Sequence, residues 1–147
     1  MTVTLVTGAN SGLGRATALL LAQKGHKVYA GMRDLEKGSK LLELAKDHDL
    51  SAIEIDVTDD DSVLACADEI NENGDSVDVL VNNAGVALNS VTEDIDIEKA
   101  KEVMDVNVWG PVRCVKAFVP SMRERGSGHV FQVSSIAGLI GHIGQTV

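Results

Sequence analysis

The sequence has 147 residues, enough for one domain of ordinary size and too few for two. Hydrophobic residues make up 44% and charged residues 24%, which is typical of a globular protein and excludes a mainly disordered or fibrous chain. With 22 acidic and 13 basic residues the formal net charge is -9, which argues against nucleic acid and anionic membrane surfaces as partners.

The N-terminus and the cysteines favour a cytoplasmic location. Residues 1–8 have no basic start and no long apolar run, so they predict a strand and not a signal peptide. No stretch approaches the roughly twenty apolar residues that a membrane span needs. Cys66 and Cys114 lie far apart without a CxxC motif, which predicts buried, reduced thiols. We expect no metal site, because the four histidines are scattered: His26, His48, His129 and His142.

Short apolar strands alternate with amphipathic helices along the whole chain, without a linker. The first half predicts a strand at 3–7, a helix at 12–24, a strand at 27–31, a helix at 35–47 and a strand at 52–56. The second half predicts a helix that starts in the cluster 58–61 and runs to 71, a strand at 77–81, a helix at 97–125 and a strand at 129–134. Gly110-Pro111 is expected to bend the long helix or divide it in two.

This order predicts an α/β fold with one doubly wound, Rossmann-type parallel sheet. We expect about five strands, helices on both faces and a single domain over residues 1–147. In such sheets ligands bind beyond the carboxyl ends of the strands, where the strand order reverses. The residues that follow each strand are therefore the candidates for a binding site.

The first of these segments, residues 7–14, is rich in glycine. A turn from strand to helix aims free backbone N–H groups and the positive end of the helix dipole at one point, which suits a pyrophosphate. Gly8 would permit the sharp turn, Gly12 the approach of phosphate, and Gly14 close packing of the helix on the strand. A purely structural turn is the alternative. The predicted cofactor contacts are Gly8, Asn10, Ser11, Gly12, Leu13 and Gly14.

After the second strand, Met32 and Arg33 stand where an NAD site would offer an acidic residue to the ribose. A guanidinium there can pair with a 2′-phosphate, so NADP(H) is favoured over NAD(H). The alternative is that Arg33 only begins a surface loop. After the third strand, Asp56 can accept a hydrogen bond from an adenine amino group, and Val57 beside it is a predicted cofactor contact.

The fourth strand runs into Asn82-Asn83-Ala84-Gly85, where amides are followed by residues small enough to let a ribose approach. Asn83, Ala84 and Gly85 are therefore predicted cofactor contacts, although asparagines in a loop are often only turn formers. In the long helix Asn107 interrupts an apolar stripe, so we expect it to be buried and to need partners there, which can be water, backbone groups or a site. Its neighbour Val106 is a further predicted cofactor contact. The fifth strand ends at Ser134-Ser135, which places two hydroxyls at the same edge.

Taken together, these segments resemble the short-chain dehydrogenase/reductase family over the entire 147 residues. Residues 7–14 match its TGxxxGxG motif, 82–85 its NNAG motif, Asn107 its helix asparagine, and Ser135 with 136–138 its catalytic serine segment. The resemblance implies an NAD(P)-dependent oxidoreductase that interconverts an alcohol and a carbonyl by hydride transfer, with Ser135 and Asn107 as catalytic residues. Met32-Arg33 looks like the NADP-preferring variant.

The resemblance also implies features that residues 1–147 do not contain. The family uses a tyrosine and a lysine four residues later as its acid/base pair, but the only tyrosine here is Tyr29 and no lysine follows Lys116. We therefore expect a C-terminally truncated fragment with an exposed fifth strand. Residues 105–128 resemble the helix through which many members assemble, so we expect the full-length parent to form homo-oligomers.

Two hypotheses about function remain. The chain is either the cofactor-binding part of an oxidoreductase, or a non-catalytic nucleotide-binding or interaction module. For the oxidoreductase we expect a small carbonyl or alcohol substrate of apolar character. The predicted wall for such a substrate is Ile136, Leu139, Ile140 and Ile143. The alternative is that these residues pack under the helices that the fragment lacks.

Overall fold

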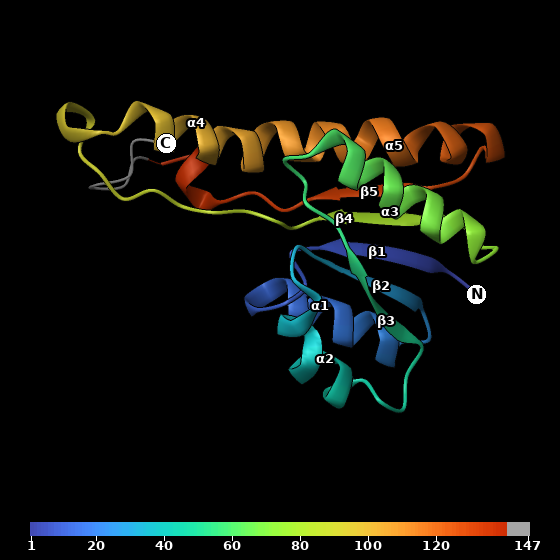
Figure 1. Ribbon diagram of the computed structural model, residues 1–147. Coiled ribbons are helices and arrows are strands. Elements are labelled where there is room, and N and C mark those ends of the chain that lie inside the picture. The colour runs from blue at the N-terminus through green and yellow to red at the C-terminus, as the bar shows by residue number, and fades with distance from the viewer. Residues whose placement is uncertain (141–147) are drawn as a thin grey trace.

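Five parallel strands form the centre of the structure, a computed structural model that describes residues 1–140. The strand order is β3-β2-β1-β4-β5, so the order reverses between β1 and β4 (Figure 1). Each neighbouring pair is parallel, which confirms the predicted doubly wound sheet. The strands are β1 (Val3–Thr7), β2 (Lys27–Met32), β3 (Leu50–Glu54), β4 (Val79–Asn82) and β5 (His129–Gln132).

Helices cover both faces of this sheet, as the sequence predicts (Figure 1). One face carries α1 (Gly12–Gln23) and α2 (Ser39–Leu44), and the other carries α3 (Asp60–Glu72) and α5 (Gly110–Arg125). Helix α4 (Ile97–Met104) lies in line with α5. Because side chains alternate along a strand, Leu5 packs on the α3 and α5 side while Val6 packs on the α1 side.

One helix and one strand differ from the sequence prediction. Residues 35–47 form a 3-10 turn, η1 (Leu35–Gly38), followed by the short α2, and not one long helix. Gly38 is buried against Met32, and a Cβ there would lie 2.9 Å from the Met32 sulfur, so the chain must press its backbone onto the sheet. The third strand also lies two residues earlier than predicted, so Asp56 follows it in the loop.

The predicted break in the long helix is present, but it is a π-helical turn and lies just before Gly110. This turn, η3 (Asp105–Trp109), separates α4 from α5. Pro111 occupies the first turn of α5, where a missing backbone N–H breaks no helical hydrogen bond. Single π turns occur often at functional sites. Two further 3-10 turns are η2 (Thr92–Asp94) and η4 (Ile136–Gly138).

Strand β5 lies at the edge of the sheet and is exposed along its length. Phe131 is 55% exposed, and Ile136, Leu139 and Ile140 of the predicted apolar wall are exposed as well. Ile143 of that wall and His142 lie outside the described residues. Within residues 1–140, no helix combines the length and the apolar character that crossing a membrane requires.

Candidate functional site

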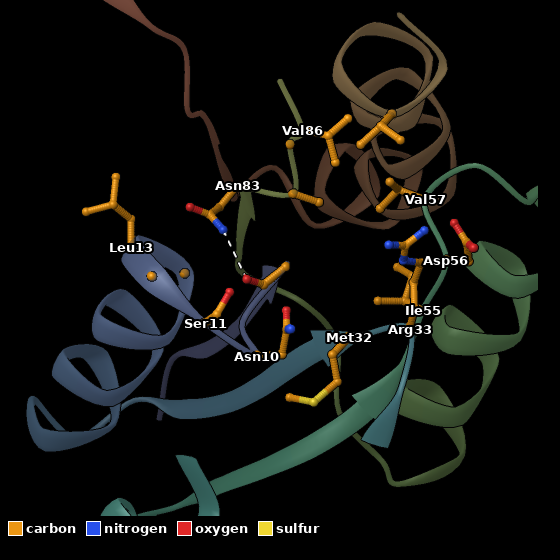
Figure 2. A pocket seen from close by; sticks show the side chains of 16 residues that line it. Asn10, Ser11, Leu13, Met32, Arg33, Ile55, Asp56, Val57, Asn83 and Val86 are labelled. Carbon is orange, nitrogen blue, oxygen red and sulfur yellow. Dashed lines mark hydrogen bonds between the residues drawn. The ribbon is translucent and has the colours of Figure 1, made fainter. Parts of the chain in front are cut away.

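A cavity of about 320 Å³ opens at the carboxyl edge of the sheet, where β1 and β4 meet (Figure 2). All thirteen residues predicted as cofactor contacts line it. Sequence reasoning missed three further lining residues, Met32, Ile55 and Val86. Each of them is a direct neighbour in sequence of a predicted residue, which is the signal that could have found them. The predicted residues at the cavity are Gly8, Asn10, Ser11, Gly12, Leu13, Gly14, Arg33, Asp56, Val57, Asn83, Ala84, Gly85 and Val106.

The glycine-rich loop has the shape that its sequence predicts. Gly8 and Gly12 both adopt positive φ, 67° and 53°, a region that favours glycine. A Cβ on Gly14 would lie 2.3 Å from the Asn83 amide nitrogen and 2.4 Å from the Gly8 carbonyl oxygen. Gly14 therefore permits close packing, but against its own loop and Asn83 and not against the strand. A Cβ on Gly12 would meet nothing within 4 Å, so this part of the loop is open.

The N-terminus of α1 also faces this cavity and lacks the anionic cap that α3 and α4 have. The N-cap residues of α3 and α4 are Asp59 and Asp96, whose carboxylates accept hydrogen bonds from backbone N–H groups. The N-cap residue of α1 is Ser11, whose side chain makes no capping hydrogen bond within residues 1–140, and the first turn of α1 has no acidic residue. Its first N–H groups and the positive end of its dipole can therefore receive an external anion.

Thr7 and Asn83 hold the two loops of the site together. The buried Thr7 hydroxyl accepts hydrogen bonds from the backbone N–H groups of Asn83 and Ala84, both at 3.0 Å. In return, the Asn83 amide donates to the Thr7 carbonyl oxygen at 2.9 Å and to the Gly8 carbonyl oxygen at 3.4 Å, and Figure 2 draws the second of these bonds. Asn83 thus lines the cavity with its donors already used. Asn82 is buried, and its side chain has no partner within residues 1–140.

Arg33 and Asp56 are the two charged residues that line the cavity. Arg33 follows β2, is exposed, and makes no ion pair within the described part of the chain. One oxygen of Asp56 accepts hydrogen bonds from the Thr58 N–H and hydroxyl at 2.9 and 2.7 Å. The site therefore offers one unpaired cation beside one carboxylate that is held in place.

Asn107 lies in the π turn and is exposed, so the expectation of buried surroundings was wrong. Its oxygen accepts the Val86 N–H at 2.9 Å, and its nitrogen donates to the Val86 carbonyl oxygen at 2.8 Å. Both polar atoms of the amide therefore have backbone partners, as one of the alternatives expects. This pair of bonds fixes Val86, a residue of the cavity wall, to the helix.

Ser135 begins the turn η4 and is exposed. Its hydroxyl accepts a hydrogen bond from the Ala137 N–H at 3.1 Å. In the described residues, neither Ser135 nor Asn107 lines the cavity, and no hydrogen bond joins the two. The structure thus brings the predicted cofactor contacts together, but within residues 1–140 it does not join the two predicted catalytic residues by a hydrogen bond.

Tyr29, the single tyrosine, lies outside the cavity and is hydrogen-bonded elsewhere. The Tyr29 side chain is buried and donates to Asp75 at 2.5 Å, and Lys27 pairs with the same carboxylate at 2.6 Å. Burial is the main cause that raises the pKa of Tyr29, so the phenol stays protonated. Tyr29 therefore serves as a structural donor that ties the segment after α3 to β2.

This cluster predicts a pH-dependent stability. Hydrogen bonds from Lys27, and then Tyr29, lower the pKa of Asp75, so its contribution is present above the ordinary carboxyl range and is lost as the pH falls through the lowered value. We expect Asp75→Asn to lower the thermal midpoint by a few degrees at pH 7, with the gap narrowing in acid. Asp68→Asn on the exposed face of α3 is the control. A gap that stays constant with pH would contradict this assignment.

The two cysteines and the question of a metal site are the other features that the sequence raises. Cys66 and Cys114 are free and buried, and burial raises the pKa of each thiol to about 12, so both stay neutral. Residues 1–140 contain no group of three His, Cys, Asp or Glu side chains placed to hold a metal ion.

Comparison with known proteins gives consistent matches. A model of the family described as short chain dehydrogenase matches residues 2–147. The chain is 40% identical over 148 residues to human 17-beta-hydroxysteroid dehydrogenase type 1, covering 95% of this chain and 44% of the relative. It is also similar to a crystal structure of a short-chain dehydrogenase from Streptomyces avermitilis, with 37% identity and a TM-score of 0.89 over 97% of this chain and 52% of that one.

A further similar structure is a gluconate 5-dehydrogenase from Burkholderia cenocepacia, solved in complex with NADP and tartrate. Its TM-score is 0.91 at 25% identity, over 99% of this chain and 58% of that one. The chain thus spans about half the length of the relatives that it matches.

Proposed function

Because the chain belongs to the short-chain dehydrogenase family, we propose that it forms the cofactor-binding part of an NADP(H)-dependent oxidoreductase that interconverts an alcohol and a carbonyl. The observation that carries the proposal is the open N-terminus of α1 at a cavity lined by every predicted cofactor contact. The similar gluconate dehydrogenase that was solved with NADP supports the choice of cofactor.

The residues at the cavity fit a dinucleotide part by part. The N–H groups of residues 12–14 would receive the pyrophosphate, and the Arg33 guanidinium would pair with the 2′-phosphate. Asp56 would accept the adenine amino group through the oxygen that Thr58 leaves free. When bound, the nicotinamide would supply or take up a hydride.

The proposed roles of Ser135 and Asn107 concern the substrate side. The Ser135 hydroxyl would orient the carbonyl oxygen, and Asn107 would support a water-mediated proton relay. Exposed Ile136, Leu139 and Ile140 favour an apolar substrate, and a relative named for a hydroxysteroid is consistent with that class. We also propose assembly through the π turn and α5, where Trp109 of η3 and Val112 of α5 are exposed. The free cysteines favour a cytoplasmic location.

Arg33→Asp should weaken NADPH binding by about a hundredfold and NADH binding by no more than about threefold, because only NADPH carries the 2′-phosphate. Isothermal titration calorimetry of both cofactors measures the difference. Lys40→Asp makes the same change in net charge on exposed α2, away from the cavity, and should leave both affinities unchanged. Equal losses for the two cofactors would refute the pairing.

A specific observation keeps the non-catalytic module as the second candidate. Tyr29 is the only tyrosine of the 147 residues, and its hydroxyl is bound to Asp75. We therefore expect this chain to bind NADPH without reducing carbonyl compounds. Robust turnover by these 147 residues would show that a tyrosine and lysine pair is not required, and a folded chain without NADPH binding would exclude both candidates.

A further inference from the structure

The start of α5 is fixed to the loop that follows β3. Arg113 donates to the Val57 carbonyl oxygen at 3.3 Å, and Val57 lines the cavity. Gly110 packs on the same residue, since a Cβ there would lie 2.8 Å from a Val57 methyl carbon. One wall of the cavity therefore rests on the first turn of α5.

The same helical segment also holds a second part of the cavity lining, the loop after β4. Val106 lines the cavity itself, and Asn107 binds both backbone polar groups of Val86. Residues 105–113 thus contact the loop after β3 through Val57 and the loop after β4 through Val86. Two loops that line the cavity are therefore fixed to one helical segment that contains the π turn.

Arg113 spans that π turn. Its guanidinium pairs with Asp105 at 2.8 Å, eight residues earlier, and with Asp60 at 3.5 Å. The side chain is 20% exposed, so the pair with Asp105 is partly shielded from water. The hydrogen bond with Asp105 also raises the pKa of Arg113, which keeps the cation charged. Asp105 lines a second cavity of about 430 Å³ that shares Arg33, Val86 and Val106 with the first.

We propose that Arg113 is a positioning residue of the dinucleotide site, which it keeps in shape by joining Val57 to the π turn that holds Val86. The inference rests on the proposed function and names a residue beyond the predicted contacts. Through Arg113, dinucleotide binding and the Asn107–Val86 hydrogen bonds stabilise each other. Loss of the guanidinium then weakens both, although it does not touch the cavity.

The chain offers a matched control on the same helix. Arg125 donates to the Val77 carbonyl oxygen at 2.8 Å, bonds Ser76 and pairs with Asp78 at 3.5 Å. It therefore makes the same kinds of contact with a strand-connecting segment, at the other end of α5. Arg113→Ala and Arg125→Ala should destabilise the chain to similar degrees, yet only one of them should affect the site.

The test is calorimetric titration of the 147-residue chain with NADPH, combined with hydrogen exchange of the Val86 amide by NMR. We expect Arg113→Ala to weaken NADPH binding about tenfold and to speed Val86 exchange, with Arg125→Ala within twofold of wild type in both. Arg113→Lys, which cannot reach Asp105 and Val57 together, should recover only part of the affinity. If Arg113→Ala fails to fold, Asp105→Asn should show the same changes at smaller size.

The outcomes separate the inference from the proposed function. A wild-type chain that does not bind NADPH overturns the proposed function. If the wild-type chain binds NADPH, and Arg113→Ala and Arg125→Ala change the NADPH affinity and the Val86 exchange equally or not at all, only the role of Arg113 is overturned.

Discussion

Gly14→Ala should destabilise the chain by about 2–3 kcal/mol and weaken NADPH binding roughly a hundredfold. Helix propensity alone predicts the opposite sign, because alanine is favoured over glycine in a helix by about 1 kcal/mol. The steric clash outweighs this helix propensity. The new methyl would lie 2.4 Å from the Gly8 carbonyl oxygen and 2.3 Å from the Asn83 amide nitrogen, so the loop must move. That movement misaligns the N–H groups proposed to receive the pyrophosphate.

Urea unfolding and NADPH titration measure the two effects. Gly138→Ala is the control, because a Cβ there meets nothing within 4 Å and stability should change by less than about 0.5 kcal/mol. A Gly14→Ala chain more stable than wild type would show that the loop yields freely and that its packing is not tight.

Thr7→Val should lower the free energy of unfolding by about 2–4 kcal/mol, although it exchanges a hydroxyl for a methyl of similar size. The substitution leaves the N–H groups of Asn83 and Ala84 without their acceptor in a partly buried site. Because these bonds join the glycine-rich loop to the loop after β4, NADPH binding should fall with stability. Thr7→Ser keeps the hydroxyl and should recover most of the loss.

Thr4→Val is the matched control in the same strand. Thr4 is equally buried, but its partner is His26 at 2.8 Å, a side chain that water can reach. We expect Thr4→Val to lower the free energy of unfolding by less than about 1 kcal/mol and to leave the NADPH affinity unchanged. If Thr4→Val and Thr7→Val had equal effects on affinity, Thr7 would have no special place at the site.

The sequence predicted the fold and the cavity well because both depend on local patterns. Strand β1 was predicted at its observed bounds, since five apolar or β-branched residues run up to Gly8. All the predicted cavity residues except Val106 were found because they follow a strand, and the carboxyl ends of parallel strands meet at one edge. Their roles toward a cofactor remain predictions.

What the sequence could not provide depends on contacts between distant segments. The π turn exists where Asp105, Arg113 and Val57 meet, and nothing local in residues 105–109 specifies that meeting. Asn107 was expected to be buried because its neighbours are apolar, yet the loop after β4 binds it at the surface. Arg113 reads in the sequence as an ordinary helix cation, and only the position of α5 over Val57 reveals its contacts.

The most direct test of the account follows the backbone N–H groups of Gly12, Leu13 and Gly14 by NMR while NADPH is added. We predict saturable shifts and slowed hydrogen exchange at these three amides, with a smaller response to NADH at the same concentration. Saturable NADPH binding that leaves the three amides unchanged, with shifts gathered elsewhere on the chain, would contradict the claim that the start of α1 receives the pyrophosphate.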